Sequence, residues 1–129
     1  MRVNDRDLIN FAQSAKEHSY SPYSGFPVGA AIECEDGSVF TGTNVENAAY
    51  GSTICAEAAA LAAAVSEGHR KFLRIAVSSD GEKYCMPCGN CRQLLNEFSP
   101  NIEVLAVRAD GRYVSYPLTQ LIPKAFEKE

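Results

Sequence analysis

The chain has 129 residues, of which 46% are hydrophobic, and it carries a net charge of −4 at pH 7 with a pI near 5.2. This size fits one domain with its own core, so we predict a single domain over residues 1–129. Charges of both signs are interspersed without a lysine or arginine cluster, which argues against polymeric nucleic acid as a partner.

Several charged residues fall among the first twenty, and the longest apolar run is too short to span a bilayer. We therefore expect no signal peptide, no membrane partner and a cytoplasmic location. Five cysteines, an odd number, favour metal or thiol chemistry over a disulfide framework in such a chain.

The first predicted element is a helix that begins after Asn4, a good N-cap residue with Asp7 three positions later. We expect it to end before the Ser-Tyr-Ser-Pro stretch at 19–22. Its apolar face is formed by Leu8, Phe11, Ala12 and Ala15.

Two antiparallel strands are predicted next, over residues 26–35 and 38–44, because an acidic turn ending in Gly37 separates two apolar runs. Cys34 lies in the first of these strands and is expected to be a small buried hydrophobe.

The later elements alternate between helix and strand. We predict helices over residues 55–67 and 88–98, strands over 73–79, 102–108 and 112–116, and a short helix near Leu118. This order favours an α/β fold with a five-stranded mixed sheet in a three-layer α/β/α arrangement. His69, which follows the second helix, is expected at the surface without a metal role.

The helix over residues 55–67 is almost entirely alanine and has almost no polar face. A helix that is apolar all round should be buried on all sides, and a domain of this size can cover only one side itself. We therefore expect a second subunit to cover the rest. The alternative is that alanine is simply the best helix former and tolerates exposure.

Three cysteines lie at the starts of two predicted helices. Cys55 opens one helix, and Cys88 and Cys91 lie one turn apart at the start of another. A catalytic zinc site typically has three protein ligands and leaves the fourth position to water. Helix N-termini favour the thiolate form, which we expect for all three residues. The pattern predicts a catalytic zinc site.

Glu57 lies two residues after Cys55, about 200° round a helix, so we expect it beside the ligands rather than among them. Zinc lowers the pKa of bound water to about 7, and a neighbouring carboxylate can take the proton. The predicted site is therefore hydrolytic.

Two other interpretations of the cysteines remain open. Cys85 could join Cys55, Cys88 and Cys91 around an iron–sulfur cluster, although this would leave Glu57 without a role. The chain could also be a zinc-stabilised binding module without activity, although structural zinc sites usually have four protein ligands.

The Cys-Ala-Glu run at 55–57, followed by Pro-Cys-x-x-Cys at 87–91, resembles the signature of the zinc nucleoside deaminases. Further segments at 22–30, 44–50 and 121–126 fall in the order expected of the short, homotetrameric cytidine deaminases. The resemblance spans nearly the whole chain. It implies the fold of that family, Zn²⁺ as cofactor and a pyrimidine nucleoside as the small-molecule substrate.

The reaction implied is hydrolytic deamination of cytidine and deoxycytidine to uridine and deoxyuridine with release of ammonia, with Glu57 as the catalytic proton shuttle. The resemblance also implies contacts to the pyrimidine from Phe26, Ala56 and Phe126. It implies a homotetramer in which Ala48 and Tyr50 reach a neighbouring subunit's site.

Asn44 and Glu46 lie two residues apart at a predicted strand end, so their side chains should point the same way. An amide beside a carboxylate suits vicinal hydroxyls, and the resemblance implies that they bind the ribose. The carboxylate would oppose a phosphate there, which favours nucleosides over nucleotides.

One position departs from the family pattern, in which an arginine usually follows the Cys-Ala-Glu glutamate, whereas this chain has Ala58. Zinc with three thiolates carries a charge of minus one, which a nearby guanidinium would offset. We predict that Arg92 takes this role. The departure also leaves open a modified cytosine nucleoside or an aminoacylnucleoside antibiotic, the substrate of blasticidin-S deaminases.

Overall fold

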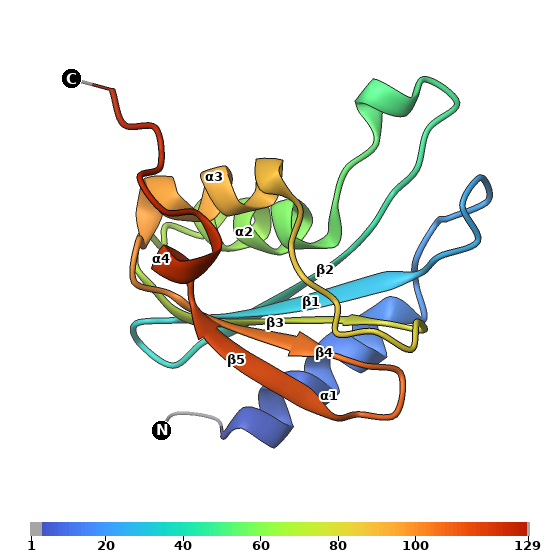
Figure 1. The fold of residues 1–129 in the computed structure, drawn as a ribbon, viewed down its shortest axis with the longest axis horizontal. Helices are drawn as coiled ribbons and strands as arrows, with labels where there is room; N and C mark the ends of the chain where they lie inside the picture. Colours follow the sequence, from blue (N-terminus) through green and yellow to red (C-terminus); the bar gives the residue numbers. More distant parts are fainter. Residues whose placement is uncertain (1–3, 129) are drawn as a thin grey trace.

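The computed structural model describes residues 4–128 as one five-stranded sheet with helices on both faces (Figure 1). The elements are α1 (Asp5–Lys16), β1 (Val28–Cys34), β2 (Val39–Thr43), η1 (Tyr50–Ser52), α2 (Ala56–Ser66), β3 (Phe72–Ser79), α3 (Gly89–Phe98), β4 (Glu103–Val107), β5 (Tyr113–Pro117) and α4 (Leu118–Leu121). Their order in the sheet is β2-β1-β3-β4-β5, with β3 and β4 parallel and the other pairs antiparallel. The predicted three-layer fold and its mixed sheet are confirmed.

Helix α1 covers one face of the sheet and begins as predicted, because the Asn4 side chain accepts a hydrogen bond from the Asp7 N–H at 2.8 Å. Its buried stripe is Leu8, Ile9 and Ala12. Phe11, which was predicted to lie on the apolar face, is 45% exposed. The stripe is centred between residues 8 and 9, so residue 11 points about 110° away from it.

Helices α2 and α3 cover the opposite face (Figure 1). Gly42 lets α2 approach β2 closely, since a Cβ at this position would lie 2.4 Å from the Ala60 nitrogen and 2.6 Å from the Ala56 oxygen. The side of α2 that faces the sheet is buried, whereas Ala62 is exposed. One chain therefore covers only one side of this alanine-rich helix.

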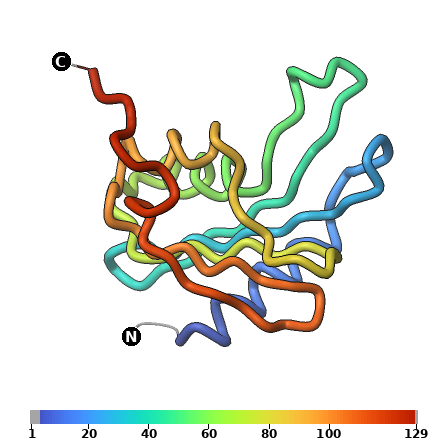
Figure 2. The backbone as a smooth tube through the Cα atoms, in the orientation of Figure 1, coloured from blue at the N-terminus to red at the C-terminus, as the bar shows by residue number. Residues whose placement is uncertain are grey.

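The segment between β2 and α2 leaves the body of the domain as an arm, which we define as residues 45–54. Figure 2 shows this arm and the segment near residue 25 extending from the same end of the sheet. Isolated bridges join Val45 to Tyr20 and to Ile54 at its base. Within residues 4–128, no helix has the length and apolar character needed to cross a membrane.

Candidate active site

The three predicted zinc ligands lie together above the sheet. Cys55 is the N-cap residue of α2, Cys88 is the N-cap residue of α3, and Cys91 lies in the first turn of α3. Their sulfurs all lie within 4.8 Å of one another, and those of Cys55 and Cys88 are 3.9 Å apart. Tetrahedral zinc with Zn–S bonds near 2.3 Å places its sulfurs about 3.8 Å apart. The donor set therefore fits a zinc ion.

The thiols differ in their ionisation, which corrects the expectation that all three favour the thiolate. Burial raises the pKa of Cys55 and of Cys91. Burial also acts upward on Cys88, but hydrogen bonds from the Cys91 N–H and from the two neighbouring thiols lower its pKa below the usual value. Without a bound cation, only Cys88 has the lowered thiol pKa that is expected at a helix N-terminus. A bound zinc ion would displace protons from the other two.

Glu57 lies beside this group but is not part of it. Its side chain comes from the first turn of α2 and the residue is only 5% exposed. Burial raises the pKa of this carboxyl group, while its own backbone N–H and a hydrogen bond from the Cys91 thiol act in the opposite direction. A proton acceptor therefore lies next to one of the three sulfurs.

Cys85 does not join the three sulfurs within the part of the chain that the structure describes. Its thiol is partly buried, which raises its pKa to about 11. The three-sulfur group, without a fourth thiol, agrees with a zinc site better than with an iron–sulfur cluster.

The two residues predicted to bind ribose have separate structural contacts. Asn44 is 8% exposed and accepts hydrogen bonds from Ser19 Oγ and, at 3.0 Å, from the Val28 N–H. Its amide nitrogen donates to the Phe26 carbonyl, also at 3.0 Å. Asn44 thus positions the segment that carries Phe26, and its contact with ribose stays a prediction.

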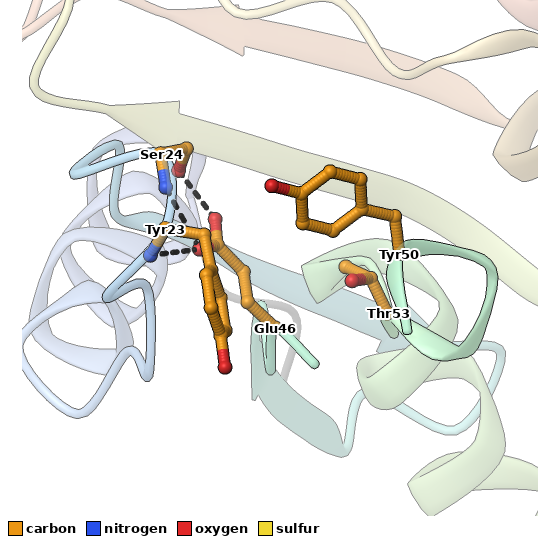
Figure 3. Close-up of a pocket in the computed structure, with 5 residues that line it drawn as sticks. All are labelled: Tyr23, Ser24, Glu46, Tyr50 and Thr53. Atoms are coloured by element: carbon orange, nitrogen blue, oxygen red, sulfur yellow. Dashed lines mark hydrogen bonds between the residues drawn. The ribbon is translucent and has the colours of Figure 1, made fainter. Parts of the chain in front are cut away.

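Glu46 accepts hydrogen bonds from the backbone N–H groups of Tyr23, at 2.9 Å, and Ser24, at 3.0 Å, and from the Ser24 hydroxyl (Figure 3). The Ser24 hydroxyl and N–H lower the pKa of this carboxyl group. Neither partner was predicted, because both lie more than twenty residues away in the chain.

A cavity of about 330 Å³ opens beside Glu46 (Figure 3). Tyr23 and Tyr50 meet there edge to face, with ring centroids 6.0 Å apart, and Ser24 and Thr53 complete the lining. Thr53 was missed as a lining residue, since alone it resembles an ordinary loop residue. The cavity therefore lies between the arm and the segment before β1.

The predicted pyrimidine contacts are unequally placed. Ala56 is fully buried, Phe26 is 45% exposed, and Phe126 is 76% exposed. The Phe126 carbonyl accepts a hydrogen bond from the Gln93 side chain at 3.0 Å, which ties the chain end to α3. Ala48 is exposed on the arm.

Comparison with known proteins identifies the family. The profile of the cytidine and deoxycytidylate deaminase zinc-binding region matches residues 2–107. The chain belongs to this family. A cytidine deaminase from Sporosarcina psychrophila is 44% identical over 123 residues, which cover 95% of this chain and 90% of that protein.

Solved structures give the same result. The crystal structure of the cytidine deaminase from Burkholderia pseudomallei superposes with a TM-score of 0.93 at 42% identity, covering 96% of this chain and all of that one. Among sequence relatives, a weaker match is a blasticidin-S deaminase from Bacillus cereus, 31% identical over 78% of this chain and 77% of that protein. The resemblance to cytidine deaminases is therefore confirmed.

The departure from the family pattern is visible in the site. Ala58 is half-buried on α2 and supplies no charge. Arg92 donates from Nε to the Pro87 carbonyl at 2.8 Å and from Nη1 to the Leu121 carbonyl at 2.7 Å. These bonds connect the start of α3 with the end of α4. That Arg92 also balances the thiolate charge stays a prediction.

Proposed function

We propose that this member of the cytidine deaminase family is a zinc-dependent hydrolase that converts cytidine and deoxycytidine to uridine and deoxyuridine and releases ammonia. The observation that carries the proposal is a buried carboxyl group, that of Glu57, in the first turn of the helix whose N-cap residue Cys55 is one of three convergent thiols. Zinc held by Cys55, Cys88 and Cys91 would supply water that loses a proton near neutral pH.

Glu57 carries protons in this mechanism. Its carboxylate takes a proton from the attacking water and delivers it to N3 of the pyrimidine, and a second proton reaches the amino group at C4. The water oxygen stays on C4 and the amino group leaves as ammonia, so the atoms balance. Burial of Glu57 favours this shuttle because few bulk waters compete for the proton.

The remaining contacts would place the nucleoside. Phe26, Ala56 and Phe126 would contact the base, and Asn44 and Glu46 the ribose. The carboxylate of Glu46 stays charged because hydrogen bonds lower its pKa, so it would repel a phosphate on the sugar. Free nucleosides are therefore the substrate class that we propose.

Glu57→Gln tests the central role. The amide keeps the size of the side chain but cannot accept the proton, so we expect kcat to fall by about 10²-fold or more with zinc content and fold unchanged. The loss of cytidine absorbance, elemental analysis and circular dichroism measure the three quantities. Glu67→Gln, at the exposed end of the same helix, is the matched control. Wild-type-like turnover in Glu57→Gln would contradict the assignment.

A second candidate function rests on Ala58, the position at which the family arginine is missing. The enzyme would then act on a modified cytosine nucleoside or an aminoacylnucleoside antibiotic. A panel of cytidine, deoxycytidine and bulkier analogues, compared by kcat/KM, separates the two. A preference for the bulkier analogues over cytidine would favour the second candidate.

We also propose that the enzyme is a cytoplasmic homotetramer whose sites are completed across subunits. Two features support this assembly: the side of α2 turned away from the sheet is apolar and partly open, and Tyr50 on the arm is 74% exposed. A tetrameric mass by light scattering is the expected result, and a monomer would contradict it.

Complementation tests whether the arm acts in a neighbouring site. In mixed oligomers, a Tyr50→Ala subunit keeps its own Glu57 and receives Tyr50 from a Glu57→Gln neighbour. Activity should therefore recover when the two differently tagged variants are co-expressed, although each alone is impaired. Mixed oligomers without recovered activity would show that Tyr50 acts within its own chain.

A further inference from the structure

A second group of metal-binding side chains lies at the opposite end of α2 from Cys55. Helix α2 ends near Gly68, whose φ of +97° reverses the chain, and His69 follows directly. His69 there meets the turn between β1 and β2. The sulfur of Cys34, a carboxylate oxygen of Asp36 and a ring nitrogen of His69 all lie within 4.8 Å of one another.

Backbone hydrogen bonds hold these donors on a defined frame. The Cys34 N–H donates to the Ser38 carbonyl at 2.8 Å, and the Gly37 N–H donates to the Cys34 carbonyl at 3.0 Å, which closes the turn. The His69 N–H donates to the Ala64 carbonyl at 3.1 Å, which fixes the loop after α2. The backbone that carries the three metal-binding side chains is therefore fixed by hydrogen bonds.

Side-chain contacts link His69 to the same turn. The His69 ring packs against Phe40 with centroids 5.3 Å apart. One ring nitrogen lies 4.0 Å from Asp36 Oδ1, and the other lies 3.4 Å from the Ser38 hydroxyl, which donates to Asp36 at 2.6 Å. Cys34 is fully buried, whereas the Asp36 side chain is 62% exposed, so one side of the group faces the core and the other faces solvent.

We propose that Cys34, Asp36 and His69 form a second metal site, which binds a borderline divalent cation of the Zn²⁺ class. One thiolate, one imidazole and one carboxylate are the three ligand types that zinc accepts, whereas Mg²⁺ and Ca²⁺ prefer oxygen ligands throughout. Two anionic ligands neutralise a divalent ion. The three-thiolate site instead carries a net charge of minus one with zinc.

A metal bound at the second site would hold two segments of the chain together. It joins the β1–β2 turn to the loop between α2 and β3, and so fixes the C-terminal end of the helix whose N-terminal end carries Cys55 and Glu57. The exposed side of Asp36 leaves room for water as a further ligand. Considered singly, Cys34 was predicted to be a buried hydrophobe and His69 a surface residue; the fold brings them together across 35 positions.

Metal stoichiometry of the wild-type enzyme loaded with one zinc per chain is the decisive measurement. Co²⁺ added to this zinc-loaded enzyme should bind as a second equivalent and give a sulfur-to-cobalt charge-transfer band, because Cys34 is a ligand. Elemental analysis after desalting counts both metals. A wild-type chain that stops at one metal, or a second equivalent without the band, overturns the proposal.

His69→Gln identifies the ligands without disturbing the core, because the His69 side chain is only half-buried. We expect it to weaken binding of the second equivalent by at least about tenfold, while the first zinc and kcat are unchanged. His18→Gln, exposed near the end of α1, is the control and should retain both equivalents. Equal binding in His69→Gln and wild type overturns the site. Two metals bound without deaminase activity would instead contradict only the proposed function.

Discussion

The start of α2 and the arm that precedes it are adjacent in the chain but differ in packing. Glu57 is 5% exposed and Cys91 is fully buried, whereas Tyr50 is 74% exposed and Phe26 is 45% exposed. Glu57 and Cys91 are thus held by one chain against its own sheet, although the zinc ligand Cys88 is exposed. Of the residues proposed to contact the nucleoside, Phe26, Tyr50 and Phe126 are exposed, whereas Ala56 and Asn44 are buried. Catalytic geometry should therefore depend on the sheet, and substrate affinity on these exposed segments.

Among substitutions outside the reacting groups, the largest effect should come from Gly42→Ala, which tests whether the sheet positions the proton carrier. The added Cβ would lie 2.4 Å from the Ala60 nitrogen and 2.6 Å from the Ala56 oxygen, two backbone atoms of α2 on either side of Glu57. Helix α2 must move, and a displacement of about 1 Å can cost about 10²-fold in rate. We expect kcat per bound zinc to fall by that order, with a stability loss of about 1–3 kcal/mol.

Gly51→Ala is the matched control for this experiment, because a Cβ at that position on the arm meets nothing within 4 Å. It should leave both kcat and the unfolding midpoint close to wild type. If Gly42→Ala lowers stability but leaves kcat per zinc unchanged, the close approach of α2 serves folding alone.

The difference between the two regions also explains what the sequence could predict. Every α-helix and strand was predicted to within about two residues, because apolar periodicity and turn residues such as Gly68 are local signals, whereas the short 3-10 helix η1 was not predicted. The grouping of Cys55, Cys88 and Cys91 was predictable for the same reason, since residue type and spacing at helix starts are visible in the chain.

Features that depend on distant contacts were not predictable. The raised pKa values of Cys55 and Cys91 follow from burial that no local pattern reports. The exposure of Phe11 depends on which side of α1 meets the sheet. The partners of Glu46, and the meeting of His69 with Cys34, arise only when segments far apart in the chain pack together.

Gly81→Ala should have a smaller effect, limited to substrate affinity. A Cβ on Gly81 would lie 3.2 Å from Cε1 and 3.3 Å from Cζ of Phe26, so the ring must shift by a few tenths of an ångström. A displaced aromatic side chain costs roughly 0.5–1.5 kcal/mol, which corresponds to a rise in KM of about two- to thirteenfold. We expect kcat to stay near wild type, because Glu57 and the cysteines belong to other segments.

A double-mutant cycle with Phe26→Leu decides whether the ring transmits this effect. If Phe26 contacts the nucleoside, Gly81→Ala should change KM little in the Phe26→Leu background, since the shorter side chain leaves room for the added methyl group. Additive effects of the two substitutions would instead place the influence of Gly81 elsewhere in the loop.

The smallest effect should come from Ser24→Ala, which removes the hydroxyl contact with Glu46 but keeps the backbone donors of Tyr23 and Ser24. The Ser24 hydroxyl makes the largest contribution to the lowered pKa of Glu46, so its loss moves that pKa up toward the ordinary value. The carboxylate is needed in its charged form, which exists above its pKa and is lost as pH falls through it. The acid limb of nucleoside affinity, measured as Kd in the Glu57→Gln background so that the raised pKa of Glu57 does not set it, should therefore shift to higher pH, with little change at neutral pH. Ser115→Ala, exposed on β5, is the control, and an acid limb unmoved by Ser24→Ala would mean that Glu46 does not bind the sugar in its charged form.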